Sequence, residues 1–191
     1  MNREVSNLIQ NGNLVKWEYK KDSLKVSLEL KKSDLLVQLH TQRNFAFTFP
    51  IIDQSNNLKA LILPHWQGIY VPLENSKWRS ILSYKKFNTL EGLTMPFWGI
   101  DYEEYIITYI VTNRFNNTLS FQNNDNNALQ TRFTHKFTQN RDVKEHSFII
   151  RLSERYSPVE PAREFRNYLI NTGQFVSMKK KQNPFLKLKD C

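Results

Sequence analysis

Large aromatic side chains and carboxylates gather in the central third of the sequence, in segments interrupted by proline and glycine. The segment LPHWQGIYVPLENSKW places aromatic rings among Pro64, Gly68 and Pro72, and a second such segment reads EGLTMPFWGID. Rings in interrupted segments are less readily explained by core packing than rings in a regularly alternating strand. Aromatic faces stack on the apolar faces of sugar rings, and carboxylates bind hydroxyl groups. The sequence therefore predicts ligand contacts by Trp66, Tyr70, Trp78, Trp98, Glu91 and Asp101.

Structural roles for these residues stay open as an alternative. Bends at proline and glycine in β-sandwiches often place a tryptophan beneath a loop, and a carboxylate can serve packing alone. Hydrolysis of a sugar bond needs two carboxyl groups at a fixed separation, which a sequence does not give. A mutarotase or epimerase-like enzyme needs a histidine that faces a carboxylate as general acid and base. His65 with Glu91 is the pair that we would test for that role.

The motifs exclude several other chemistries. No two of the histidines have the spacing of metal ligands with a third candidate nearby, and the sole cysteine is Cys191. No glycine-rich phosphate loop or nucleophile elbow is present, and the chain has only five glycines. We therefore expect no metal and no cofactor.

Positive charge is concentrated near the C-terminus. The net charge is +9, and the last part of the chain contributes Lys179, Lys180, Lys181, Lys187 and Lys189. Basic residues attract phosphate, and aromatic rings stack on bases, so a stand-alone basic β-protein that binds nucleic acid or a protein partner is an alternative. Lysine and arginine are not interleaved with the aromatic residues of LPHWQGIYVPLENSKW. Nucleic acid is therefore the weaker prediction, and a tail that is solvated or faces a partner explains the charge better.

The regular patterns predict a β-rich fold. Apolar residues alternate in SLKVSLEL and DLLVQLHT, which predicts a hairpin, and YIITYIVTN is rich in β-branched residues. One convincing helix follows, with Ser157 as its cap and Pro158 at its first position. Many strands without strand–helix alternation predict a mainly β protein: an antiparallel, supersandwich-like β-sandwich with one C-terminal α-helix.

The helix also marks a predicted boundary. We assign residues 1–156 to the β-sandwich domain and residues 157–191 to a helix and basic tail. The N-terminal segment MNREVSNLIQNGN lacks the apolar stretch of a signal peptide, and no apolar run is long enough to span a membrane. With a single cysteine, these features predict a cytoplasmic protein without a membrane partner.

The order of the segments resembles a known family. LILPHWQGIYVPLENSKW, EGLTMPFWGID and PAREFRNYLINTGQFVSMKKK follow one another as in the N-terminal galactose-mutarotase-like β-sandwich domain of multidomain glycoside hydrolases. In that family a catalytic (β/α) barrel follows the sandwich and carries the catalytic groups. The resemblance implies that this chain is truncated before the barrel, with a catalytic barrel domain or chain as its partner. It further implies a non-catalytic, carbohydrate-contacting accessory domain.

Overall fold

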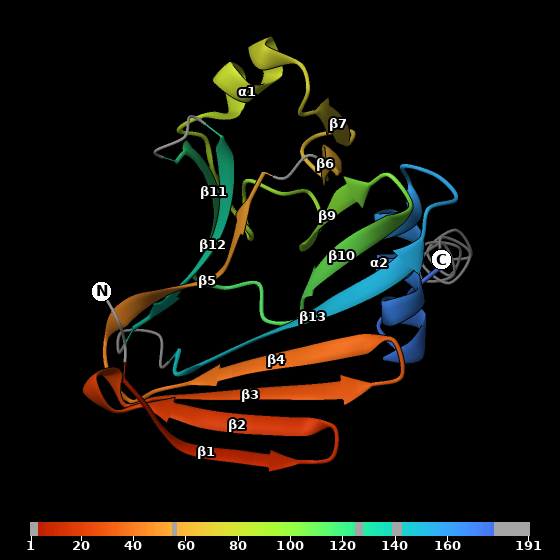
Figure 1. The fold of residues 1–191 in the computed structure, drawn as a ribbon. Coiled ribbons are helices and arrows are strands. Elements are labelled where there is room, and N and C mark those ends of the chain that lie inside the picture. Colours follow the sequence, from red (N-terminus) through yellow and green to blue (C-terminus); the bar gives the residue numbers. More distant parts are fainter. Residues whose placement is uncertain (1–3, 55–56, 125–127, 139–142, 178–191) are drawn as a thin grey trace, which may run out of the picture.

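The chain folds into two antiparallel sheets that face each other, as the computed structural model shows for residues 4–54, 57–124, 128–138 and 143–177 (Figure 1). Within these residues, the larger sheet has nine strands in the order β1-β2-β3-β4-β13-β10-β9-β6-β7, and the smaller has four in the order β5-β12-β11-β8. The predicted mainly β sandwich is therefore confirmed.

Every strand of the larger sheet pairs antiparallel with its neighbours. Its strands are β1 (Val5–Asn11), β2 (Leu14–Tyr19), β3 (Leu24–Lys31), β4 (Asp34–His40), β6 (Leu58–Leu63), β7 (Ile69–Pro72), β9 (Phe97–Tyr102), β10 (Tyr105–Val111) and β13 (Glu145–Glu154). The smaller sheet contains β5 (Phe45–Asp53), β8 (Lys86–Asn88), β11 (Asn117–Asn123) and β12 (Leu129–Phe137). The predicted hairpin of SLKVSLEL and DLLVQLHT is formed by β3 and β4.

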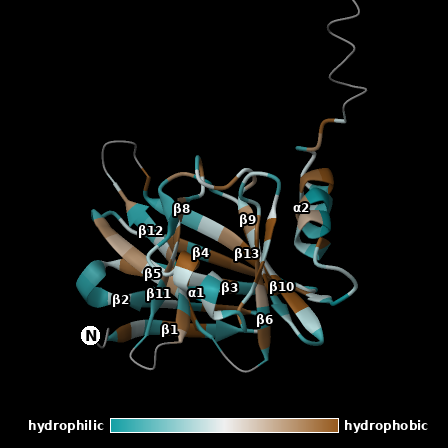
Figure 2. Ribbon diagram, turned by 90° about the horizontal axis from the view of Figure 1, so that it is seen from above, coloured by the Kyte–Doolittle hydropathy of each residue, from teal (hydrophilic) through white to brown (hydrophobic). Residues whose placement is uncertain are grey.

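The main core lies between the two sheets, because side chains alternate across each strand. On β9, Trp98 and Ile100 point into this core. The other face of β9 and β10 carries a second apolar cluster, in which Phe97 and Ile110 pack against Phe165. Figure 2 shows the resulting mixture of hydrophobic and hydrophilic residues along the strands and on the helix at the side. We call the face away from the smaller sheet the outer face.

Helix α2 (Glu160–Asn171) covers part of that outer face. Pro161 in its first turn packs over Gly99, where an added Cβ would lie 2.5 Å from the proline Cγ. Arg151 of β13 forms ion pairs with Asp34 at 2.6 Å and with Glu164 of the helix at 2.5 Å. The helix is therefore fixed to the sheet by apolar packing at one place and by a partly buried charge network at another.

The structure differs from the sequence prediction in local details. The helix begins at Glu160 instead of Pro158, because the Ser157 carbonyl accepts the Glu160 N–H and closes a turn first. A second, short helix, α1 (Ser76–Leu82), begins at the end of LPHWQGIYVPLENSKW, where the sequence predicted no helix, and the Asn75 side chain caps it. Strand β5 continues through Pro50, which is tolerated because β5 is an edge strand.

The lysine-rich tail from Lys179 onward lies outside the described residues, as do the last residues of the predicted C-terminal segment. None of the helices in the described part of the chain is long and apolar enough to cross a membrane.

Candidate ligand-binding site

The predicted aromatic segment forms a hollow against the start of α2. This aromatic hollow has a volume of about 260 Å³ and opens on the outer face of the larger sheet. Its lining includes Trp66, Tyr70, Met95, Phe97, Val159 and Ala162. Residues of the β6–β7 connection thus meet residues of the helix that lie some ninety positions later in the chain, which no sequence pattern indicated.

Trp66 projects from this hollow as an exposed but well-supported ring. Its side chain is 80% exposed, and its backbone is left-handed with φ 55°. The Trp66 carbonyl accepts a hydrogen bond from the Thr94 hydroxyl at 2.9 Å, and the indole stacks on His65 with ring centroids 4.8 Å apart. The His65 ring in turn donates from Nδ1 to the Gly92 carbonyl at 2.7 Å. An exposed tryptophan held by its neighbours is suited to stacking on a ligand ring.

Tyr70 and Asp101 are joined at one end of the hollow. The Tyr70 hydroxyl donates to Asp101 Oδ2 at 2.9 Å, and Arg155 Nε donates to Asp101 Oδ1 at 2.6 Å. Asp101 is fully buried, so this ion pair and hydrogen bond compensate a charge that would otherwise be costly. Burial and the Asp101 carboxylate raise the pKa of Tyr70, while Arg155 opposes that shift.

Two of the predicted tryptophans lie elsewhere. Trp98 is 0% exposed and stacks on Tyr109 with ring centroids 3.8 Å apart, so no ring face remains open to a ligand. We therefore correct its predicted ligand contact to a core role, which follows from the alternation of β9. Trp78 lies on α1 and packs against the main core. Neither residue lines the aromatic hollow within the described residues.

Glu91 is exposed. It is close in sequence to residues that line the hollow, but it does not line the hollow itself in the described structure. The predicted pair of His65 and Glu91 shows no hydrogen bond or ion pair among the described residues, and His65 Nδ1 donates to the Gly92 carbonyl. The histidine supports the Trp66 ring instead.

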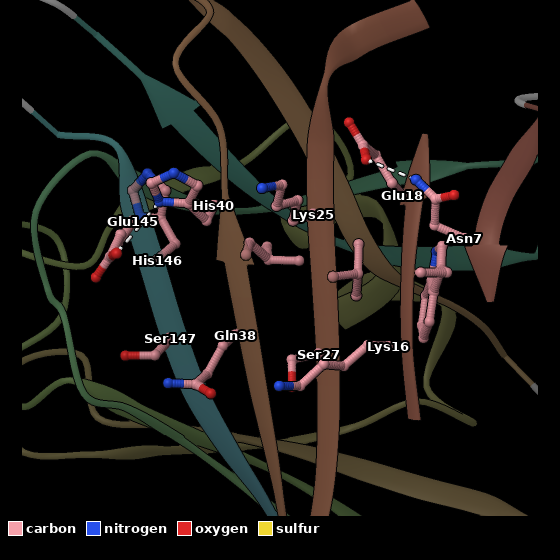
Figure 3. A pocket seen from close by; sticks show the side chains of 13 residues that line it. Asn7, Lys16, Glu18, Lys25, Ser27, Gln38, His40, Glu145, His146 and Ser147 are labelled. Atoms are coloured by element: carbon pink, nitrogen blue, oxygen red, sulfur yellow. Dashed lines mark hydrogen bonds and ion pairs between the residues drawn. The ribbon is translucent and has the colours of Figure 1, made fainter. Parts of the chain in front are cut away.

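A larger hollow, the polar trough, lies on the outer face of β2, β3, β4 and β13 (Figure 3). It has a volume of about 490 Å³. Cross-strand register places polar side chains in two rows across it: Glu18, Lys25, His40 and Glu145, and Lys16, Ser27, Gln38 and Ser147. His40 Nδ1 lies 3.2 Å from Glu145 Oε1, and Asn7 Nδ2 donates to Glu18 Oε2 at 3.2 Å.

The sequence missed three kinds of residue that shape these sites. Arg155 lies between β13 and α2 in a segment that contains no known motif. It donates a hydrogen bond to Asp101, which is 54 positions earlier in the chain. Met95 and Val159 are exposed apolar residues, which are common on surfaces and carry no signal alone. His40 and Glu145 are 105 positions apart and meet only through the pairing of β4 with β13.

Comparison with known proteins identifies the fold. No family model and no curated protein sequence matches the chain. The structure is similar to alpha-N-acetylgalactosaminidase NagBb from Bifidobacterium bifidum, in its GalNAc complex, with a TM-score of 0.68 and 13% identity. The match covers 94% of this chain and 32% of that chain, so the chain spans about a third of the length of its solved relative. The ligand-free form of the same enzyme gives a TM-score of 0.69 over the same shares.

A more distant likeness links the chain to the GH36 alpha-galactosidase AgaA from Geobacillus stearothermophilus, with a TM-score of 0.43 and 7% identity. It covers 81% of this chain and 27% of that chain. At these identities the comparisons show a shared fold alone, because one fold can carry many unrelated functions.

Proposed function

We propose that this chain is a non-catalytic accessory domain of a glycoside hydrolase, of the galactose-mutarotase-like sandwich type, and that it contacts carbohydrate through the aromatic hollow. The observation that carries the proposal is the exposed indole of Trp66, fixed over an apolar hollow by Thr94 and His65. An exposed tryptophan that is held in place offers area for stacking at little entropic cost.

The fold independently supports the proposed relation to glycoside hydrolases. It corresponds to about a third of a solved chain whose name states an activity on an N-acetylgalactosamine linkage. We infer that catalysis belongs to another domain or chain, a (β/α) barrel in the proposed parent enzyme. The exposed apolar residues at the hollow are also compatible with such a neighbour, because exposed apolar patches mark ligand or protein contacts.

Binding of the purified chain to a glycan array, with Trp66→Ala beside it, tests the proposal. Loss of a stacking contact worth about 1.5 kcal/mol should weaken binding about tenfold. Tyr84→Ala is a matched control, because Tyr84 is 81% exposed, has a left-handed φ of 72° and lies outside the hollow. We expect Tyr84→Ala to bind like the wild type.

A parallel titration with single-stranded DNA separates the alternative class. Binding of DNA that falls steeply with salt, together with no glycan signal, would replace the carbohydrate proposal by a nucleic-acid one. Glycan binding that survives Trp66→Ala would remove the hollow from the proposal.

A further inference from the structure

We propose that the aromatic hollow selects sugars that carry a carboxylate group, and that the guanidinium of Arg155 binds that carboxylate. The inference rests on the proposed function and narrows its substrate class from carbohydrate to acidic sugars. It follows from how Arg155 is held, from which of its donors remain, and from the absence of acidic groups in the described lining.

Arg155 is held in place from behind by a buried acid. Asp101 is 0% exposed, and it accepts Arg155 Nε at 2.6 Å and the Tyr70 hydroxyl at 2.9 Å. A long arginine side chain normally loses rotamer freedom when it binds a ligand. Here the buried carboxylate orients the guanidinium before any ligand arrives, which reduces that cost.

Donors at the terminal nitrogens of Arg155 remain for a ligand beside the contact of the guanidinium with the Tyr70 hydroxyl. The guanidinium carries five N–H donors in a planar fork that matches a carboxylate. Asp101 takes the Nε donor, and Asp101 is the sole ion-pair partner of Arg155 among the described residues. The Arg155 side chain is 39% exposed, so water or a ligand reaches it. Arg155 does not itself line the hollow in the described structure, but Asp101 joins its guanidinium to the Tyr70 hydroxyl, and Tyr70 lines the hollow. The guanidinium therefore lies just beyond the Tyr70 end of the hollow, where the carboxylate of a bound sugar would meet it.

The electrostatics of the hollow fit an anion better than those of the polar trough. The described lining of the hollow contains no aspartate or glutamate, and Arg155 compensates the charge of Asp101 behind it. The trough carries Glu18 and Glu145 beside Lys16 and Lys25, so its acidic groups offset its basic ones and would oppose an anion at close range. The hollow, at about 260 Å³, lies below the usual range for drug-sized ligands, so one sugar ring is the appropriate occupant.

Calorimetric titration with matched small ligands tests this inference. Methyl glucuronoside and methyl galacturonoside would be compared with their methyl esters, which keep the ring and remove the charge. A charge-assisted hydrogen bond to the carboxylate should make each acid bind about tenfold more tightly than its ester. Arg155→Lys keeps a cation beside Asp101 but removes the planar fork, and it should reduce this preference to near unity.

Two further variants and a thermal unfolding measurement separate a loss of the preference for acids from misfolding. The double variant Asp101→Asn with Arg155→Gln removes both charges together and should also lose the preference for acids. Arg166→Lys alters an exposed arginine of α2 that contacts Phe175, and the preference should stay. Thermal unfolding of each variant confirms that it is folded.

The outcomes separate this inference from the proposed function. Equal binding of acids and esters, both lost in Trp66→Ala, would overturn the acidic-sugar inference and leave the carbohydrate domain standing. A preference that persists in Arg155→Lys would also overturn it. Absence of all sugar binding, on the array and in solution, would overturn both.

Discussion

The aromatic hollow and the polar trough lie on the same outer face of the larger sheet, but they are supported in different ways. The trough is a surface of one sheet, in which neighbouring strands place short polar rows side by side. The hollow is assembled from a strand connection, a loop and the start of α2, with a buried acid behind it. The smaller hollow therefore has the more fixed side chains.

This comparison shows that volume is a poor guide to a binding site. The trough is nearly twice as large, with 490 Å³ against 260 Å³, yet its polar groups are solvated on an open sheet. Solvated ion pairs contribute little and are easily rearranged. At the hollow, three exposed groups have a partner that sets their direction: His65 for Trp66, and Asp101 for Tyr70 and Arg155. Pre-organisation of this kind favours binding.

The largest expected effect concerns the core beneath the hollow. Trp98→Ala should lower the free energy of unfolding by about 3–5 kcal/mol, because it leaves a cavity where a fully buried indole stacks on Tyr109. Trp66→Ala, at the exposed rim, should change the same quantity by less than about 0.5 kcal/mol. Urea unfolding of both variants measures the contrast. Equal losses would show that Trp66 is a structural residue and would weaken its role in binding.

A second prediction concerns the loss of stability at low pH that His146, at the floor of the trough, should cause. Burial lowers the pKa of His146 to about 4, although its bond to the Lys136 carbonyl opposes the shift. Between the unfolded pKa near 6.5 and pH 4 the unfolded chain binds the extra proton, so stability falls as the pH falls. The loss from this one histidine should reach about 2 kcal/mol at pH 5.

Chemical denaturation at pH 7.5 and pH 5 measures this loss, with His146→Leu as the comparison. The variant lacks the buried titrating group, so its stability should fall by about 2 kcal/mol less over the same range. Amide exchange at pH 5 should increase in β4 and β13, beside His146, before it increases in α2. Earlier opening of α2 would show that the hollow is the weaker region.

A third prediction tests how closely the helix must approach the sheet. Gly99→Ala would place a methyl group 2.5 Å from the Pro161 ring, which has no flexible end to move aside. The helix start must shift, at a cost on the order of 1 kcal/mol. Because Val159 and Ala162 line the hollow, glycan binding should weaken together with stability. Ser27→Ala in the trough is the control and should alter neither.

The sequence predicted the strands well but predicted the site only in part. Alternation in SLKVSLEL and DLLVQLHT determines which side chains are buried, and β3 and β4 follow it. The sequence singled out Trp66, Tyr70 and Asp101 because rings and carboxylates are unusual in an interrupted segment. The structure brings these three residues together, and their contact with a ligand stays a prediction. The same reasoning misplaced Trp98, since the alternation of β9 continues after the proline and turns its ring inward. Arg155 could not be found, because its role depends on contact between β9 and a residue 54 positions later.

The smallest expected effect lies in the polar trough. Glu145→Gln removes the partner of His40, but the Glu145 side chain is 79% exposed, and water replaces its hydrogen bond. The free energy of unfolding should therefore change by less than about 0.5 kcal/mol. The same variant, measured by polarimetry with glucose and galactose, should leave sugar mutarotation at the rate of the wild type.

A mutarotation rate above the uncatalysed value in the wild type, lost in both His40→Ala and Glu145→Gln, would reverse the comparison. The trough would then hold a working acid–base pair, and its solvated appearance would be misleading. Unchanged rates in all three proteins would leave the trough as an ordinary polar sheet surface. The aromatic hollow would then remain the proposed ligand site, because buried Asp101 orients the groups at one end of it and His65 supports Trp66.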